Sequence, residues 1–253
     1  MNVIRPTYHL AMRAVRETLR QPGVEVGNIF IPVFFFFVTV GAVGQIAGAA
    51  FNVDNYEGFQ VPVAVLQAVA GAAAVSGVAI TTDIEKGYFD KLLLTPTPRI
   101  AILLGRFTAD GIRSAAFTAI VLVVGAIAGA GMEAGPLGYV AILALAALFG
   151  AAYSGIGIAI GLKTGSPQAA QAGFLIFFPL LFLSPAFAPK EIFAGWLEFL
   201  ATINPVTYIL EGMRSLVLTG WEPADLLAAL AAIGGLLVIT STLSLLALRT
   251  RVA

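Results

Sequence analysis

The chain contains 253 residues, of which 59% are hydrophobic and 11% are charged. Soluble domains carry about 25% charged residues, so this sequence cannot supply the polar surface of a water-soluble enzyme. Its 14 basic and 14 acidic residues cancel, and the absence of Cys with a single His excludes disulfide frameworks, Cys nucleophiles and zinc sites. The composition indicates an integral membrane protein with several spans, forming one domain over residues 1–253.

Residues 1–25 predict a cytoplasmic helix lying in the headgroup layer of the membrane. An apolar stripe recurs at helical spacing, and arginines fall on another face. The stripe is Tyr8, Met12, Val15 and Leu19, and the arginines are Arg13, Arg16 and Arg20. Such a helix suits the interface, and Pro22 and Gly23 should then end it. The alternative is a solvated helix whose arginines only fix the orientation of the chain.

Six apolar runs are candidate membrane spans, since a bilayer needs about 20 apolar residues per helical span. They cover residues 28–51, 61–82, 110–132, 137–162, 172–187 and 224–248. The fifth run is short and contains Pro179 and Pro185, so we expect it to bend or to combine with the next segment of the chain. The first run is longer than the apolar part of a signal peptide, so we expect it to be retained.

Lys and Arg collect in the segments that would face one side of the membrane. Twelve of the 14 basic residues lie on this side: they come before the first run, between runs two and three, between runs four and five or after the last run, with Arg113 counted at the membrane boundary of the third run. The positive-inside rule makes that side the cytoplasm. We therefore expect an all-α protein with six transmembrane helices and both ends of the sequence in the cytoplasm.

Residues 83–99, between the second and third runs, form the richest cytoplasmic segment. Charged residues surround a short apolar set that includes Tyr88 and Phe89, and Pro96 and Pro98 should end any helix here. Arg99, Arg106 and Arg113 then recur every seven residues and predict one basic stripe along the next helix. A short amphipathic helix between two membrane helices can dock on a partner and transmit its motion. The alternative is a loop that only anchors topology, and composition alone does not decide between them.

Residues 188–223 are too apolar for an ordinary loop and too interrupted for a span. Their apolar stripe is Phe193, Trp196, Leu197 and Leu200, followed by a turn at Asn204-Pro205. Tyr208, Glu211 and Arg214 come next at a spacing of three, which places Glu211 and Arg214 for an ion pair on one helix face. We expect an external re-entrant helical hairpin, whose irregular backbone must be buried in protein or line a water-filled cavity.

Ionisable residues are nearly absent from the six runs as read from the sequence, which argues against a proton relay or an ion-coupled pump. Phenylalanine is abundant, with 18 residues, and gathers in the first and fifth runs. Packing and lipid contact are the commoner roles for such residues. An apolar substrate route is the alternative.

At its two irregular segments the sequence resembles the permeases of type-2 ABC exporters, and it looks closest to drug-resistance permeases of the daunorubicin-exporter type. Their loop after the second span typically reads E-[RK]-G-x-x-x-x-L-x-x-T-P-x-x-R, and their segment before the last span resembles P-x(n)-W-L-x(n)-N-P-x-T-Y-x-x-E-x-x-R. The first pattern is matched by Glu85, Lys86, Gly87, Leu92, Thr95, Pro96 and Arg99. The second is matched by Pro189, Trp196, Leu197, Asn204, Pro205, Thr207, Tyr208, Glu211 and Arg214. The resemblance covers essentially the whole chain, although Tyr88-Phe89 replaces a more usual small-polar and aliphatic pair.

The resemblance implies an ATP-driven exporter of a lipophilic drug-like or lipid substrate in the bacterial inner membrane. It would contain two permease subunits, of the same or related chains, each resting on a separate ABC ATPase. The residues expected to couple to the ATPase are Glu85, Lys86, Tyr88, Phe89, Asp90, Lys91 and Arg99. Those expected along the substrate pathway are Phe34, Phe37, Gln67, Phe174, Phe177, Phe178 and Phe182. The hairpin expected to cap the pathway carries Trp196, Asn204, Pro205, Tyr208, Glu211 and Arg214.

No G-x-x-x-x-G-K-[ST] phosphate loop occurs in the sequence, so we expect no enzymatic activity and no cofactor in this chain, with ATP and Mg bound by the partner. Export of a polysaccharide or glycolipid is the main alternative. A route for sugars would use Trp and Tyr as stacking platforms, and the two Trp and six Tyr beside 18 Phe argue mildly for an apolar substrate instead. A membrane protease would need a Ser–His pair or several zinc ligands, and His9 alone supplies neither. An assembly protein of unrelated fold also stays open.

Overall fold

The structure is a computed structural model that describes residues 3–51, 53 and 55–252. Over these residues the chain is entirely helical, with ten α-helices, one 3-10 turn and no strands. The elements are α1 (Ile4–Leu19), α2 (Pro22–Phe51), α3 (Tyr56–Glu85), α4 (Tyr88–Leu93), α5 (Arg99–Ile127), α6 (Pro136–Thr164), α7 (Pro167–Phe182), η1 (Lys190–Ile192), α8 (Gly195–Ile203), α9 (Pro205–Leu218) and α10 (Pro223–Val252).

Five described helices are long and apolar enough to cross a membrane, namely α2, α3, α5, α6 and α10. The fifth expected run corresponds to α7, whose 16 residues end at Phe182, so the expected bounds of 172–187 are wrong at both ends. Pro179 lies inside α7, and Pro185 follows its last residue. Because a straight span needs about 20 residues, the count of six spans stays a prediction.

Helix α3 forms the centre of the bundle and packs against α2, α5, α6, α7 and α9. Within this chain 72% of its most apolar stretch is buried, compared with 11% for α2 and 17% for α10. Gly77 brings α3 very close to α6, since a Cβ atom on Gly77 would lie 2.6 Å from the carbonyl oxygen of Gly157. Small residues allow membrane helices to approach this closely.

The first helix is shorter than expected. Helix α1 ends at Leu19, and α2 begins at Pro22 rather than after residue 25, because proline fits the first turn of a helix. Ala11 and Ala14 are the buried residues of α1 and face α5. Tyr8 and Leu19, at the two ends of the expected apolar stripe, are exposed.

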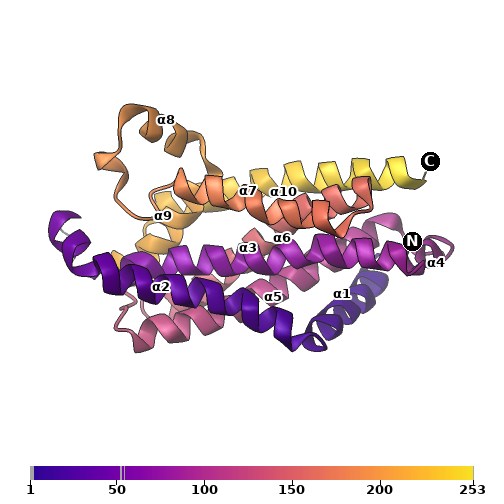
Figure 1. The fold of residues 1–253 in the computed structure, drawn as a ribbon, viewed down its shortest axis with the longest axis horizontal. Coiled ribbons are helices and arrows are strands. Elements are labelled where there is room, and N and C mark those ends of the chain that lie inside the picture. The colour runs from indigo at the N-terminus through magenta and orange to yellow at the C-terminus, as the bar shows by residue number, and fades with distance from the viewer. Residues whose placement is uncertain (1–2, 52, 54, 253) are drawn as a thin grey trace.

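The segment before α10 contains the expected turn between two helices. Helix α8 projects from the bundle (Figure 1), and only Ala201 of its residues is buried. Helix α9 instead packs against α10 and α3 and buries most of its residues. Phe193 of the expected apolar stripe precedes α8 in an extended conformation, so the stripe is shorter than predicted.

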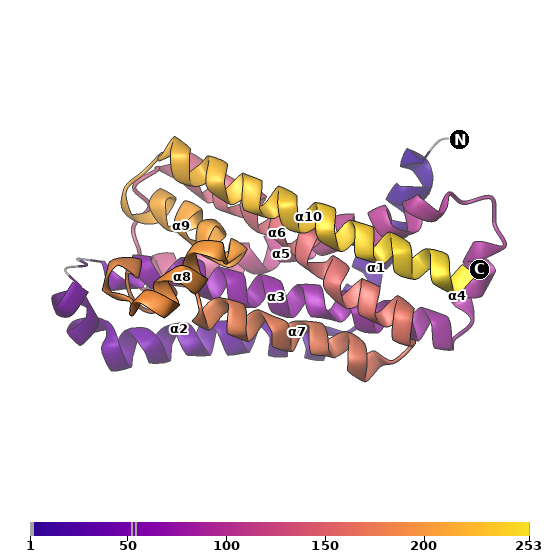
Figure 2. The ribbon, with the colours of Figure 1, turned by 90° about the horizontal axis from the view of Figure 1, so that it is seen from above.

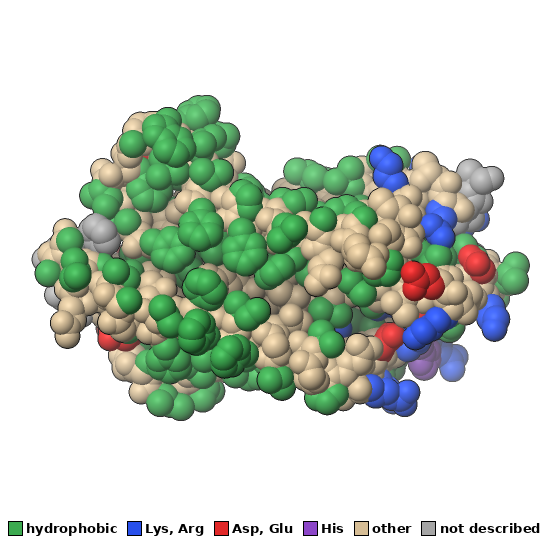
Figure 3. Space-filling model, viewed as in Figure 1, with side chains coloured by type: hydrophobic (Ala, Val, Ile, Leu, Met, Phe, Trp, Pro, Cys, Tyr) green, Lys and Arg blue, Asp and Glu red, His purple; other side chains and the backbone are tan. Residues whose placement is uncertain are grey.

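The charged side chains gather at one end of the molecule. Both ends of the described chain lie there with α4, and the face in Figure 3 shows Lys, Arg, Asp and Glu concentrated at this end over a largely hydrophobic remainder. We call it the charged end. Helices α8 and α9 lie at the opposite end (Figure 2).

Candidate functional site

Helix α4 is a short helix at the tip of the charged end, between α3 and α5. Gly87 enters it with a left-handed φ of 66°, a conformation that glycine adopts without strain. The helix stops at Leu93, and α5 starts at Arg99, as the two prolines predicted. Five of the seven residues expected to couple to an ATPase are exposed around it, namely Glu85, Lys86, Asp90, Lys91 and Arg99.

The other two expected coupling residues face the protein. Phe89 is 1% exposed and packs in an apolar cluster with Leu103 and Phe107 of α5. It therefore anchors α4 to the bundle rather than offering a surface to a partner. Tyr88 is half-buried, because the guanidinium of Arg13 from α1 covers its ring at 3.8 Å from the centroid.

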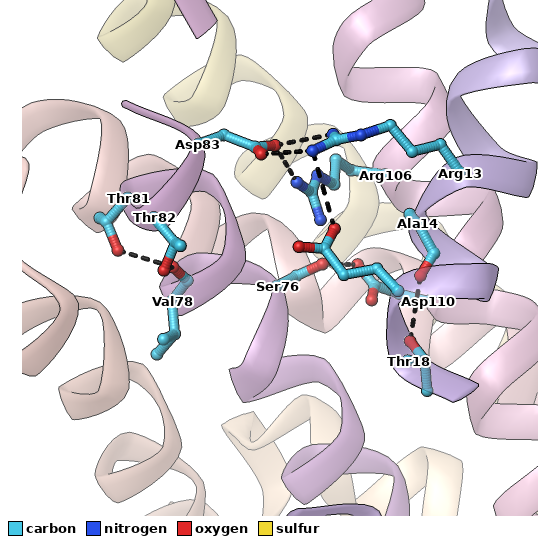
Figure 4. Close-up of polar contacts among 11 residues, drawn as sticks. Arg13, Ala14, Thr18, Ser76, Val78, Thr81, Thr82, Asp83, Arg106 and Asp110 are labelled. Carbon is cyan, nitrogen blue, oxygen red and sulfur yellow. Dashed lines mark hydrogen bonds and ion pairs between the residues drawn. The ribbon is translucent and has the colours of Figure 1, made fainter. Parts of the chain in front are cut away.

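Asp83, near the end of α3, joins three helices. Arg13 of α1 donates to both carboxylate oxygens, at 3.0 and 2.6 Å, and Arg106 of α5 donates to Oδ2 at 2.5 Å (Figure 4). The hydrogen bonds to Asp83 raise the pKa of Arg13 above its ordinary value, so this guanidinium stays charged. We call this arrangement the Asp83 bridge. It connects α1 and α5 to the end of α3, and the contact between Arg13 and Tyr88 extends it to α4.

A second group of charges lies next to the bridge, further along α5. Arg113 donates to the carbonyl oxygen of Ala72 at 3.0 Å and to the hydroxyl of Thr18. Its guanidinium also lies 3.7 Å from Asp110 and 4.0 Å from Glu25 at the start of α2. Asp110 additionally accepts a hydrogen bond from Ser76. These contacts connect α1, α2, α3 and α5 through buried polar groups.

One sequence-based expectation is wrong at this site. Arg106 and Arg113 do not form an outward basic stripe, since they are 7% and 8% exposed and face carboxylates. Glu25 and Asp83 lie in α2 and α3 but outside the apolar runs 28–51 and 61–82, and of this group only Asp110 and Arg113 fall within a run, 110–132. The sequence did contain one signal for this buried charged cluster. Arg106, Asp110 and Arg113 are spaced so that they lie on one face of α5.

Two cavities adjoin these charges. One, of about 80 Å³, is lined by polar groups of α1, α3 and α5 and the start of α2, including Glu17, Thr82 and Arg106. The other, of about 290 Å³, lies between α1, α2 and α5 and is lined mainly by apolar side chains. Thr18, Glu25 and Arg113 border both cavities.

The residues expected along a substrate pathway are only partly brought together. A separate cavity of about 50 Å³ between α2, α3 and α7 is lined by four of them, Gln67, Phe174, Phe177 and Phe178. Phe34 and Phe37 project from the exposed face of α2 and are about half exposed. Phe182 is exposed at the end of α7, where it stacks on Phe187.

The helix pair at the opposite end is held by its turn. Asn204 accepts a hydrogen bond from the backbone of Val206 and donates to the carbonyl oxygen of Leu180 in α7, which fixes the start of α9. The hydroxyl of Tyr208 donates to the carbonyl oxygen of Thr202 at 2.6 Å. Pro205 is the first residue of α9, while Trp196 is exposed on α8.

Arg214 does not form the expected partnership. The ion pair with Glu211 is not among the ion pairs of the described residues. The guanidinium of Arg214 lies over the ring of Phe59 at 3.6 Å and donates to the Phe59 carbonyl oxygen at 3.4 Å. Burial lowers the pKa of Arg214 and raises the pKa of Glu211. Together these contacts attach α9 to the start of α3.

A sequence profile of the ABC-2 type transporter family matches residues 6–218, which include most of α1, the α4 segment and α9. The chain belongs to this family. ABC-2 permeases are the transmembrane subunits of ABC transporters and are not themselves the catalytic ones. Among the described residues no group of three or more His, Asp or Glu side chains is placed to hold a metal ion.

Three relatives of this ABC-2 permease carry names that refer to drugs. A daunorubicin resistance ABC transporter permease of Streptomyces coeruleorubidus is 26% identical over 208 residues, which cover 81% of this chain and 72% of the relative. A probable doxorubicin resistance permease of Mycobacterium tuberculosis is 23% identical over 219 residues, covering 85% and 77%. A probable multidrug ABC transporter permease of Escherichia coli is 28% identical over 194 residues, covering 76% and 51%. The expectation of a drug-resistance type of ABC permease is confirmed at the level of the family.

Proposed function

We propose that this permease is the membrane subunit of an ATP-driven exporter that moves a lipophilic, drug-like or lipid substrate out of the cytoplasm or the inner leaflet. A separate ABC ATPase would bind ATP and Mg, and two permease subunits would form the pathway. The family and the names of the relatives support this role. The positive-inside rule supports a multi-pass placement in the bacterial inner membrane with the charged end in the cytoplasm.

The Asp83 bridge is the observation that carries the proposed mechanism. Helix α4 offers exposed charges to a partner, and its buried Phe89 anchors it to α5. Arg13 contacts both α4, through Tyr88, and α3, through Asp83. When the ATPase subunits close, a push on α4 would therefore move α1, the end of α3 and the start of α5 together. Those helices lead directly into the bundle.

The test uses this chain purified with a co-expressed ABC ATPase from the same organism and reconstituted in lipid. Hydrolysis of ATP would be measured with and without doxorubicin. Glu85→Ala and Arg99→Ala should abolish the drug-dependent change in rate while ATP hydrolysis itself continues, because they remove charges at the proposed contact. Arg16→Ala, on the exposed face of α1, is the matched control and should behave as the parent.

Two outcomes would contradict the proposal. One is that no ATPase associates with the chain. The other is that drug-dependent hydrolysis ignores both loop variants. Stimulation by a glycolipid and not by doxorubicin would favour the alternative of glycan export.

A further inference from the structure

Helix α1 carries three exposed arginines, Arg5, Arg16 and Arg20, which we call the arginine row. None of them belongs to an ion pair among residues 3–51, 53 and 55–252. They are spaced by eleven and four residues, which is about three turns and one turn of helix, so they lie on one face of α1. Their charges are therefore available to a partner outside this chain.

The opposite face of α1 is fixed against the bundle, beside α5 at the charged end (Figure 1). Ala11 and Ala14 are buried and pack on Ala109 of α5. A Cβ atom on Gly105 of α5 would lie 2.7 Å from the Cβ atom of Leu10, so the two helices are in close contact. Because Ala11 and Ala14 face α5, the helical period directs the arginine row away from the bundle.

The two flanks of the arginine row differ in character. Tyr8 and Leu19 lie on one flank and are exposed, and Leu19 continues the apolar surface of α2 and α5, with which it lines the larger cavity. Arg13 lies on the other flank, where its guanidinium contacts Asp83 and the ring of Tyr88 in α4. The row therefore lies between an apolar edge and the exposed charges around α4. This is the level at which an amphipathic helix in a membrane interface meets the lipid headgroups.

We propose that the arginine row is a recognition surface for the headgroups of anionic phospholipids in the membrane leaflet at the charged end. The three guanidinium groups would donate to lipid phosphates, while Tyr8 and Leu19 would rest on the acyl chains. Arg5 and Arg20 are separated by about 22 Å of helix, so a single phosphate cannot reach both, whereas a layer of headgroups can.

The charge of the row selects among headgroups. Glu17 is the one acidic residue in the sequence of α1, and it pairs with Arg13 outside the row. A zwitterionic headgroup would bring an ammonium towards the arginines, whereas an anionic one brings only negative charge. Each arginine near an anionic surface strengthens binding about fivefold. This inference goes beyond the proposed export function, because it concerns the lipid around the subunit and neither the substrate nor the ATPase.

The test is binding of single lipids to the full chain in dodecyl maltoside, measured by native mass spectrometry. The probes are dioleoyl phosphatidylglycerol and dioleoyl phosphatidylcholine, which share their acyl chains and differ in headgroup charge. The parent should bind phosphatidylglycerol about tenfold more tightly than phosphatidylcholine. Arg5→Gln/Arg16→Gln/Arg20→Gln should reduce this preference to about twofold, mainly by weakening phosphatidylglycerol. Arg5→Lys/Arg16→Lys/Arg20→Lys keeps the charges and should retain most of the preference.

A matched control separates the position of the charges from their number. Lys86→Gln/Lys91→Gln/Lys163→Gln removes three positive charges from exposed positions elsewhere at the charged end and should keep the preference of the parent. Size-exclusion profiles and melting temperatures would show that each variant is folded.

Three outcomes would overturn the proposal. The first is equal affinity of the parent for the two lipids. The second is the same loss of preference in the control as in the glutamine variant of the row, because total charge would then be responsible. The third is an unchanged preference in that variant together with failure to co-purify with the ATPase, which would make the row a protein-docking surface. Drug-dependent ATP hydrolysis by the parent would still decide the export function separately.

Discussion

At the scale of single residues, Asp83 joins α1, α3 and α5 at the charged end. It accepts hydrogen bonds from two arginines that belong to different helices, and its side chain is 8% exposed. Removing one partner of a buried ion pair leaves the other charge without compensation. We expect Asp83→Asn to lower the free energy of unfolding by about 3 kcal/mol. The loss should not be larger, because Arg13 is partly exposed and regains some water.

Chemical denaturation in detergent would measure this loss. Glu85→Gln is the matched control, since Glu85 lies two residues away on the same helix but is exposed, and it should leave stability unchanged. If both variants unfolded at the same denaturant concentration as the parent, the Asp83 bridge would not contribute to stability.

Glu211 should make stability depend on pH. Burial raises its pKa above the ordinary value of 4.5, so the folded chain holds this proton at pH values where the unfolded chain has released it. The stability linked to Glu211 is therefore complete below 4.5 and is lost as the pH rises through the raised pKa. Glu211→Gln should melt at a higher temperature than the parent at neutral pH, and the difference should shrink towards pH 4.5.

Melting temperatures across this pH range would check the result, with the exposed Glu198→Gln as the control that shows no difference. A constant difference between Glu211→Gln and the parent at every pH would mean that Glu211 does not titrate as burial requires.

At the scale of helices, the contact between α3 and α6 depends on the absence of a side chain at Gly77. A Cβ atom there would meet backbone atoms of Gly157, which cannot move aside as a flexible side chain can. We expect Gly77→Ala to separate the two helices and to lower the free energy of unfolding by about 2 kcal/mol. Gly41→Ala in α2, where nothing lies within 4 Å of the added atom, should be neutral or slightly stabilising. Thermal unfolding of both variants would measure this, and equal melting temperatures would contradict the close contact.

The sequence predicted the positions of the helices better than it predicted the contacts between them. Hydropathy located the long helices, and Pro96, Pro98 and Pro205 marked the ends that the structure contains. The Asp83 bridge was missed because Arg13 and Asp83 are 70 residues apart, and a sequence without an alignment does not reveal which helices touch. The burial of Phe89 was not predicted for a similar reason, since it depends on α5 and not on the amphipathic pattern of α4.

At the scale of the whole molecule, the orientation can be tested directly because the chain contains no cysteine. Lys91 lies in α4, and Lys163 lies at the end of α6 beside the contact between Leu162 and Arg251, so single cysteines there would lie at the charged end. The backbone of Glu133 bonds to Val217 of α9, so a cysteine there would lie at the other end. In intact cells, a membrane-impermeant maleimide should label only the Glu133→Cys variant. After the cells are broken, it should label all three. Labelling of Lys91→Cys in intact cells would show that the orientation is opposite to the proposed one.

The exposed apolar surfaces of α2 and α10 are where we expect contacts with lipid or with a second subunit. Little of their most apolar stretches is buried within this chain, whereas α3 and α6 are largely enclosed. Apolar helix faces in a membrane protein contact lipid or another subunit. Our expectation of a second permease subunit therefore concerns these outer helices, and the pairing itself stays a prediction.

The Asp83 bridge and the neighbouring charges also affect the order in which the helices reach their final positions during synthesis. Synthesis proceeds from α1 towards α10, so Arg13 and Glu25 leave the ribosome long before Asp83, Arg106 and Arg113 exist. A charged side chain in a membrane helix costs about 3 kcal/mol when it has no partner. The first turn of α2 and the position of α1 therefore become final only when α5 has been inserted. A nascent chain that stops before residue 113 lacks Arg113, the ion-pair partner of Glu25, and leaves that carboxylate without this partner while the later helices are inserted.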